Sequence, residues 1–205
     1  MKEEYKGVKF KTILDNAEAP VDSRLDELRY WCKVFHEKNL APSYPDGSFG
    51  NLSFRIKPEE NIFIITGSRI GLKEALSNDC FVKVTRCDMN ECTVFAAGTR
   101  DPSSESMLHY AIYRQRSDVN AVFHGHCNEL LQSAALLGIT ETEKEEPYGT
   151  IELMNSVLKI SEKDNFLIIK KHGFISLGNS MKEAGVKSWV YSILSSGAKH
   201  YSFFP

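Results

Sequence analysis

Short apolar segments separated by turn residues are the feature of this sequence that most constrains its fold. Runs rich in branched and aromatic residues predict strands at residues 52–56, 62–66, 81–85, 93–97, 119–123, 166–169 and 174–177. Apolar residues at helical spacing predict helices at residues 23–39, 105–116, 129–137, 151–160 and 181–196. Because strands and helices do not alternate strictly, we expect an α/β protein of the α+β type, in which helices flank a central, mostly antiparallel sheet.

Length and charge exclude several classes of protein. The chain has 205 residues, and we expect residues 1–205 to form a single domain. A formal net charge of −2 argues against a nucleic-acid partner and against a polybasic membrane protein. No apolar run approaches the ~20 residues that span a bilayer, and the first residues lack the apolar core of a signal peptide. We therefore expect no membrane partner and a cytoplasmic location.

The cysteines agree with a reducing compartment. There are five of them, an odd number in a chain that is long enough to fold without disulfides. Cys87 and Cys92 are close enough in sequence to suggest a metal site, but no second pair completes a set of four ligands. We expect five reduced cysteines that serve packing.

The segment from Val122 to His126 contains the most informative chemistry. An apolar strand ends there in His-x-His. Residues i and i+2 of a strand point to the same face, so His124 and His126 are directed to one place, and Gly125 leaves room between them. Histidine is the commonest metal ligand near neutral pH. The pattern predicts a metal site, although two ordinary hydrogen-bonded histidines at a strand end remain an alternative.

Two more residues could complete the ligand set. His172 follows the predicted strand at 166–169, so it also lies at a strand end, and Glu105 lies near the start of a predicted helix. Three histidines and one carboxylate would fill a tetrahedral zinc site. The alternative for Glu105 is an acid in the first helical turn that only interacts with the helix dipole.

Three short polar segments are candidates for binding phosphate. Asn51 follows a glycine-rich loop, residues 65–68 end a strand, and Ser103 and Ser104 lie at a predicted helix start, where free N–H groups attract anions. Turn formation and helix capping are the alternative roles of such residues. None of the segments is a P-loop.

Taken together, these segments resemble the class II aldolase/adducin family of zinc-dependent sugar-phosphate enzymes. The resemblance extends from about Leu25 to Gly178 and depends on an ordered set of motifs: DGSFGNLS at 46–53, IITGS at 64–68, PSSESMLH at 102–109, DVNAVFHGH at 118–126 and KHGFISLG at 171–178. It implies a three-layer α/β/α fold and a homotetramer with active sites between subunits.

The resemblance also implies roles for particular residues. His124, His126 and His172 match the zinc ligands, and Glu105 matches the acid that serves the aldolase branch as ligand and as acid/base catalyst. Contacts to the phosphate or the rest of the substrate are implied for Asn51, Thr66, Gly67, Ser68, Ser103 and Ser104. Tyr148 is the candidate for a catalytic acid supplied by a neighbouring subunit, and Tyr201 is a second candidate from the C-terminal tail.

The function implied is that of a zinc-dependent class II aldolase, which cleaves or forms a C–C bond in a small ketose phosphate through a metal-stabilised enediolate. Another divalent metal could replace Zn²⁺. The alternatives are an epimerase, dehydratase or decarboxylase on the same scaffold, or a non-catalytic adducin-like interaction module. The chain departs from the family at Ser68-Arg69, where the aldolases have Ser/Thr-Gly, so Arg69 either binds an anion or alters the loop. His109 is either close behind the metal ligands or a partly exposed helix residue.

Overall fold

The computed structural model describes residues 7–71, 73 and 75–201, with side chains described as far as residue 197. Nine strands form one sheet in the order β1-β7-β6-β5-β4-β8-β11-β10-β9. Their bounds are β1 Lys11–Asn16, β4 Asn51–Arg55, β5 Phe63–Thr66, β6 Phe81–Asp88, β7 Thr93–Ala97, β8 Ala121–Gly125, β9 Thr140–Glu141, β10 Phe166–Ile169 and β11 Gly173–Gly178.

The pairing of the strands confirms a mostly antiparallel sheet. The six inner pairings, from β7·β6 to β11·β10, are antiparallel, and only the edge pairs β1·β7 and β10·β9 are parallel among the described strands. Both edge strands were absent from the predicted elements. β1 is largely exposed and therefore lacks alternating apolar residues, and β9 has two residues at the start of an acidic stretch.

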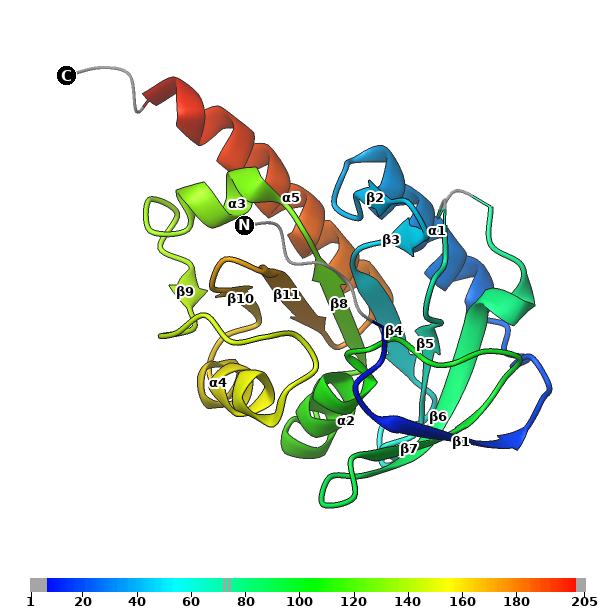
Figure 1. Cartoon of the computed structure of the whole chain (residues 1–205). Helices are drawn as coiled ribbons and strands as arrows, with labels where there is room; N and C mark the ends of the chain where they lie inside the picture. Colours follow the sequence, from blue (N-terminus) through cyan, green and yellow to red (C-terminus); the bar gives the residue numbers. More distant parts are fainter. Residues whose placement is uncertain (1–6, 72, 74, 202–205) are drawn as a thin grey trace.

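Helices cover both faces of the sheet and confirm the α/β fold (Figure 1). Their bounds are α1 Leu25–Glu37, α2 Ser106–Gln115, α3 Asn128–Ser133, α4 Ile151–Ser161 and α5 Met181–Tyr201, with a 3-10 turn at Asn78–Cys80. The core on one face joins α1, α3 and α5 to the sheet, and the core on the other face joins α2 and α4 to it. Along β8, Phe123 belongs to the first core and Val122 to the second, as the period of two in a strand requires.

Two local differences from the predicted elements affect the site. β8 was expected to end at Phe123 but continues to Gly125, so His124 lies within the sheet. The predicted loop around Pro42 and Asp46 contains a small hairpin, β2 (Ser43–Tyr44) and β3 (Gly47–Ser48), because Tyr44 pairs with Gly47 across a tight turn. This hairpin lies next to the end of β8 (Figure 1).

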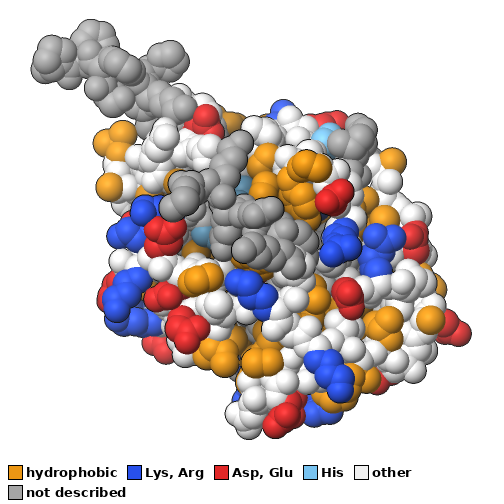
Figure 2. Space-filling view, in the orientation of Figure 1, with side chains coloured by type: hydrophobic (Ala, Val, Ile, Leu, Met, Phe, Trp, Pro, Cys, Tyr) orange, Lys and Arg blue, Asp and Glu red, His pale blue; other side chains and the backbone are white. Residues whose placement is uncertain are grey.

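The surface agrees with the charge of the sequence. On the face in Figure 2, the described acidic and basic side chains are interspersed, and neither sign forms a broad patch there. None of the helices within the described residues is long and apolar enough to span a membrane. All five cysteines are free thiols.

Candidate metal centre

The pairing of β8 with β11 orients the first histidine. His124 Nδ1 lies 2.8 Å from the carbonyl oxygen of Phe174. A carbonyl only accepts hydrogen bonds, so Nδ1 carries the proton and donates it, and the lone pair remains on Nε2. His124 shares the strand face of Val122, which is the face covered by α2. A backbone bond of this kind fixes the tautomer and direction of a metal-ligating imidazole.

Two further imidazoles meet His124. His126 comes directly after β8, and its Nε2 lies 3.0 Å from Nε2 of His124. His172 lies in the turn between β10 and β11, with its ring centroid 5.1 Å from that of His124 and 4.8 Å from that of His126. One ring nitrogen from each of the three histidines lies within 4.8 Å of the other two. The three rings therefore converge on one point.

Glu105, at the start of α2, places a carboxylate next to these histidines. It is the N-cap residue of α2, but its side chain makes no capping hydrogen bond. Instead, Oε2 lies 3.1 Å from Nε2 of His124, and Oε1 lies 3.2 Å from Nε2 of His172. Asn51 Nδ2 donates a hydrogen bond of 2.9 Å to Oε2. The carboxylate is 4% exposed and faces the histidines rather than the helix end.

The protonation states of these groups follow from burial and charge. Burial alone raises the pKa of Glu105, but His124, His172 and the amide of Asn51 outweigh it and hold that pKa well below its ordinary value. Burial lowers the pKa of His124 and lowers that of His126 further. Glu105 as a carboxylate, and His124 and His126 as neutral imidazoles, are the forms in which these side chains bind a metal ion.

The donor set fits a divalent ion. With ligand bonds of about 2.1 Å, the ligand atoms of a tetrahedral zinc ion lie roughly 3.4 Å apart. The distances of 3.0, 3.1 and 3.2 Å that join His124 to His126, His124 to Glu105, and His172 to Glu105 are close to that spacing. Three imidazoles and a carboxylate also suit Mn²⁺, Co²⁺ and Fe²⁺.

Two glycines allow this packing. A Cβ atom on Gly173 would overlap the carbonyl oxygen of Gly125 and lie 2.7 Å from Cε1 of His124. A Cβ atom on Gly125 would lie 2.5 Å from the ring of Phe174. The glycine between the two histidines therefore permits close packing of β8 on its neighbours, in addition to the space between the imidazoles that the sequence suggested.

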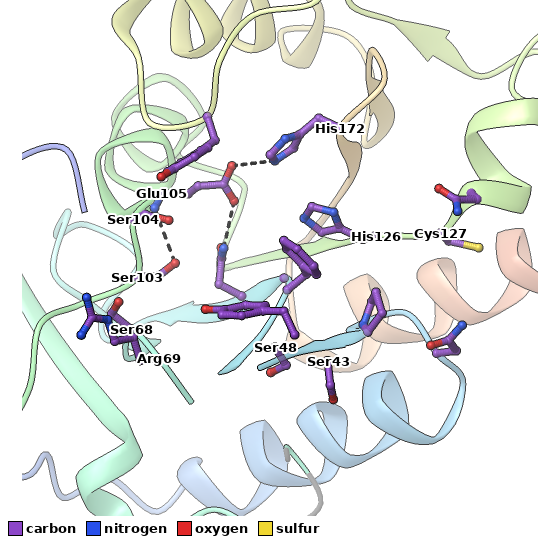
Figure 3. A pocket seen from close by; sticks show the side chains of 18 of the residues that line it. Ser43, Ser48, Ser68, Arg69, Ser103, Ser104, Glu105, His126, Cys127 and His172 are labelled. Carbon is purple, nitrogen blue, oxygen red and sulfur yellow. Dashed lines mark hydrogen bonds and ion pairs between the residues drawn. The ribbon is translucent and has the colours of Figure 1, made fainter. Parts of the chain in front are cut away.

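A cavity of about 410 Å³ opens at the histidines. Figure 3 shows Ser68 and Arg69 on the same side of it as Ser103 and Ser104, and Cys127 on the far side. Of the residues proposed from the sequence, the cavity is lined by Asn51, Gly67, Ser68, Ser103, Ser104, Glu105, His126, Tyr148 and His172. His124 is fully buried behind His126. The hydroxyl groups of Ser68, Ser103 and Ser104 thus line one end of the cavity, and the candidate metal ligands lie nearer its middle (Figure 3).

Thr66 requires a correction. We expected it to contact the substrate, but its side chain is 1% exposed and does not line the cavity. Thr66 shares the strand face of Ile64, which packs in the core against α1, and its hydroxyl accepts a hydrogen bond from the backbone N–H of Leu52. The hydroxyl therefore connects β5 to β4.

Tyr148 lines the cavity of its own chain. The resemblance implied a tyrosine from a neighbouring subunit, whereas Tyr148 is held inside its own chain by two contacts. Its hydroxyl donates to the carbonyl oxygen of Gly7 at 3.3 Å, and Lys9 Nζ donates to the Tyr148 carbonyl oxygen at 2.6 Å. Tyr201 ends α5, and its side chain lies outside the described residues.

A buried hydrogen-bond network lies one helical turn beyond Glu105. His109 Nδ1 lies 2.7 Å from Ser53 Oγ, which lies 2.8 Å from the hydroxyl of Tyr113. His109 is fully buried, and burial lowers its pKa to about 3. The structure therefore rules out the partly exposed helix histidine that we considered from the sequence. His109 connects α2 to β4 and so supports the helix that presents Glu105.

Two residues that shape the site were not found from the sequence. Phe49 packs its ring against His126, with centroids 4.9 Å apart. Lys73, which is 2% exposed, donates hydrogen bonds to the hydroxyl of Ser48 at 2.5 Å and to the carbonyl oxygen of Phe49 at 3.0 Å. A lysine in a loop gives no sequence signal of burial, and the Phe49 contact depends on a turn that propensity does not specify.

The fold and the cavity together define a class of protein. These are α/β proteins in which histidines at the end of an inner strand of a mostly antiparallel sheet form a candidate metal site. Residues 26–192 match the Class II Aldolase and Adducin N-terminal domain family. The chain belongs to this family, which confirms the resemblance seen in the sequence.

Individual relatives agree with this assignment. The L-fuculose phosphate aldolase of Methanococcus vannielii is 32% identical over 180 residues, which cover 78% of this chain and 86% of that protein. A methylthioribulose-1-phosphate dehydratase of Leptospira interrogans is 31% identical over 136 residues, which cover 65% of this chain and 50% of that protein. The crystal structure of L-fuculose-1-phosphate aldolase from Thermus thermophilus shares the fold, with a TM-score of 0.67 and 19% identity over 90% of this chain and 99% of that one.

Proposed function

We propose that this protein is a zinc-dependent aldolase that cleaves or forms a C–C bond in a small ketose phosphate. The single observation that supports this most is the convergence of three histidines and Glu105 beside a cavity lined by serine hydroxyls. The similarity to the L-fuculose phosphate aldolase of Methanococcus vannielii favours this reaction over others on the same fold.

His124, His126, His172 and Glu105 are the residues that would hold the ion. When bound, a divalent ion acts as a Lewis acid toward the negative charge that develops on substrate oxygens. The backbone bond to Phe174 holds His124 in one tautomer, which keeps Nε2 available to the ion. Asn51 holds the carboxylate of Glu105 in place.

Glu105 and Tyr148 are the proposed proton carriers. The Glu105 carboxylate is the basic group nearest to the histidines. It would accept a proton from a substrate hydroxyl or carbon once substrate binding separates it from His124 and His172, the contacts that hold its pKa low. Tyr148 shares the cavity and would donate a proton to the opposite end of the breaking bond. Ser68, Ser103 and Ser104 would hold the phosphate, and this fixes the distance between the reacting bond and the ion.

A second reaction class has a specific observation in its favour. The relative from Leptospira interrogans is named a dehydratase of a ketose 1-phosphate, so elimination of water from a similar substrate is the alternative. An epimerase or decarboxylase would use the same residues. A non-catalytic module has no need of a buried carboxylate among three imidazoles, and the geometry argues against it.

Self-association into a tetramer is part of this proposal. One face of α5 exposes Val186, Trp189, Val190, Ile193 and Leu194, each at least 40% exposed. Their spacing of three and four residues makes a continuous apolar stripe, which is typical of a helix that packs against another chain. The free cysteines are consistent with a cytoplasmic location.

The test is a product assay with ketose 1-phosphates. We expect dihydroxyacetone phosphate to form, the activity to disappear after treatment with a chelator, and zinc to restore it. His172→Ala should be inactive, while His36→Ala, which changes a histidine of α1 outside the cavity, should retain activity. Release of water without cleavage would favour the dehydratase, and full activity in metal-free protein would refute the mechanism.

A further inference from the structure

The hydroxyl-lined end of the cavity is built from two chain segments. Gly67 forms an isolated antiparallel bridge with Pro102, and Ser68 N donates to the carbonyl oxygen of Asp101 at 2.8 Å. These bonds bring Ser68 and Arg69 to the side of the cavity where Ser103 and Ser104 lie (Figure 3).

The backbone N–H groups of Gly67 and Ser68, in the first segment, already make hydrogen bonds within the protein. Gly67 N donates to the carbonyl oxygen of Cys80 at 2.8 Å, and Ser68 N is taken by Asp101. Neither N–H group is free to bind an anion in the way that a phosphate-binding loop does. The hydroxyl groups of the serines are neutral donors, so they supply no positive charge to balance the double negative charge of a phosphate.

Arg69 is the cation that can supply this charge. Its side chain lines the same cavity, and the guanidinium has no ion pair or hydrogen bond within the part of the chain that the structure describes. Lys171 also lines the cavity but pairs with Glu145 at 2.7 Å. Lys9, which lies nearby, donates to the carbonyl oxygen of Tyr148. Arg69 therefore differs from its basic neighbours in having its donors available.

The backbone conformation of Arg69 is one that glycine adopts more readily than arginine. Arg69 has φ of 54°, in the left-handed region where glycine is unstrained and other residues are disfavoured. The following residue, Ile70, is buried, so the backbone is fixed on that side. Arginine is less stable than glycine at such a position, so glycine can replace Arg69 without straining the backbone.

We propose that the guanidinium of Arg69 binds the phosphate dianion of the substrate and makes this cavity select phosphorylated over unphosphorylated ketoses. The inference rests on the proposed function, because it assigns the charge recognition within that substrate site. A guanidinium presents paired N–H donors that match two phosphate oxygens, and bonds of this kind are stronger than those from neutral hydroxyls. Arg69 acts in binding and takes no part in proton transfer.

The first experiment measures the binding of inorganic phosphate by calorimetry. We expect Arg69→Gly to weaken binding by about 10-fold or more, and Arg69→Lys to retain part of the affinity because it keeps the charge. Glycine fits the backbone at this position, so the variant should fold. Arg114→Ala is the matched control, since it removes an exposed arginine of α2 that does not line the cavity. Phosphate binding by Arg69→Gly within twofold of the unaltered protein, or by the unaltered protein not at all, would overturn the proposal.

The second experiment separates this inference from the proposed function. With a ketose 1-phosphate that the protein cleaves, Arg69→Gly should raise KM about 10-fold and change kcat much less, and the advantage over the unphosphorylated ketose should shrink. An unchanged KM would overturn the role of Arg69 while cleavage still supported an aldolase. Weakened phosphate binding in a protein that cleaves no ketose phosphate would support the anion site and refute the aldolase.

Discussion

Replacing Lys73 with methionine should change how the stability of this protein depends on pH. Lys73 is 2% exposed and its ammonium donates only to neutral acceptors, Ser48 and Phe49, among the described residues. Burial lowers the pKa of Lys73 from 10.5 to about 8. At ~1.4 kcal/mol for each tenfold change, this difference corresponds to about 3 kcal/mol by which burial disfavours the charged form.

The sign follows from where the proton is lost. Below pH 8 the lysine is charged in the folded and the unfolded chain, and the full cost of burial is present. Between pH 8 and 10.5 the folded chain has lost the proton that the unfolded chain keeps, so the unfolded state binds more protons and the lysine's contribution to stability rises with pH. Relative to Lys73→Met, the free energy of unfolding of the unaltered protein should therefore rise by about 2.5 kcal/mol between pH 7 and pH 10.

Urea unfolding of the metal-free protein, followed by tryptophan fluorescence at several pH values, measures this difference. The absolute effect of Lys73→Met at pH 7 combines removal of a buried charge with the loss of hydrogen bonds to Ser48 and Phe49, so the change with pH is the sharper test. Lys159→Met is the control, because Lys159 is an exposed residue of α4 whose ammonium pairs with Glu143 at the surface. A stability difference between Lys73→Met and the unaltered protein that is constant from pH 7 to pH 10 would refute the reasoning.

Three further predictions follow from the site and the surface. Glu105→Gln should leave a folded protein with turnover reduced at least ~100-fold, measured by product release, because an amide accepts no proton; near-normal turnover would remove Glu105 as the base. Gly173→Ala should lower the free energy of unfolding by about 1–3 kcal/mol, because its Cβ would clash with the Gly125 carbonyl and the His124 ring, and unfolding in urea measures the loss. Ile193→Glu should shift the protein to smaller species in analytical ultracentrifugation, because it places a charge in the apolar stripe of α5; an unchanged sedimentation coefficient would exclude this face from the interface.

The inner part of the fold could be predicted from the sequence because its strands are buried on both faces. β4, β5, β8, β10 and β11 are fully buried and appear in the sequence as short apolar runs. The edge strands lack this pattern, since one side of each faces solvent. The family resemblance is confirmed, and two of the motifs on which it depends, at 118–126 and 171–178, include the buried strands β8 and β11.

The candidate site was harder to predict from the sequence than the fold. His124 and His126 share a strand end, so local periodicity relates them, but their approach to His172 and Glu105 depends on strand order and on how α2 packs. Thr66 was expected at the substrate from the family resemblance, and the sequence does not show that its hydroxyl faces the core rather than the cavity. The roles of the four converging side chains stay predictions until a metal is measured.

Metal content is the measurement that tests the account most directly. Protein prepared with zinc and then dialysed should contain about one divalent ion per chain by elemental analysis. His126→Ala and His172→Ala should lose most of it while remaining folded by circular dichroism, and His36→Ala should retain it. Unaltered protein that binds no divalent ion, or a His172→Ala variant that still holds a full equivalent, would contradict the assignment of this centre.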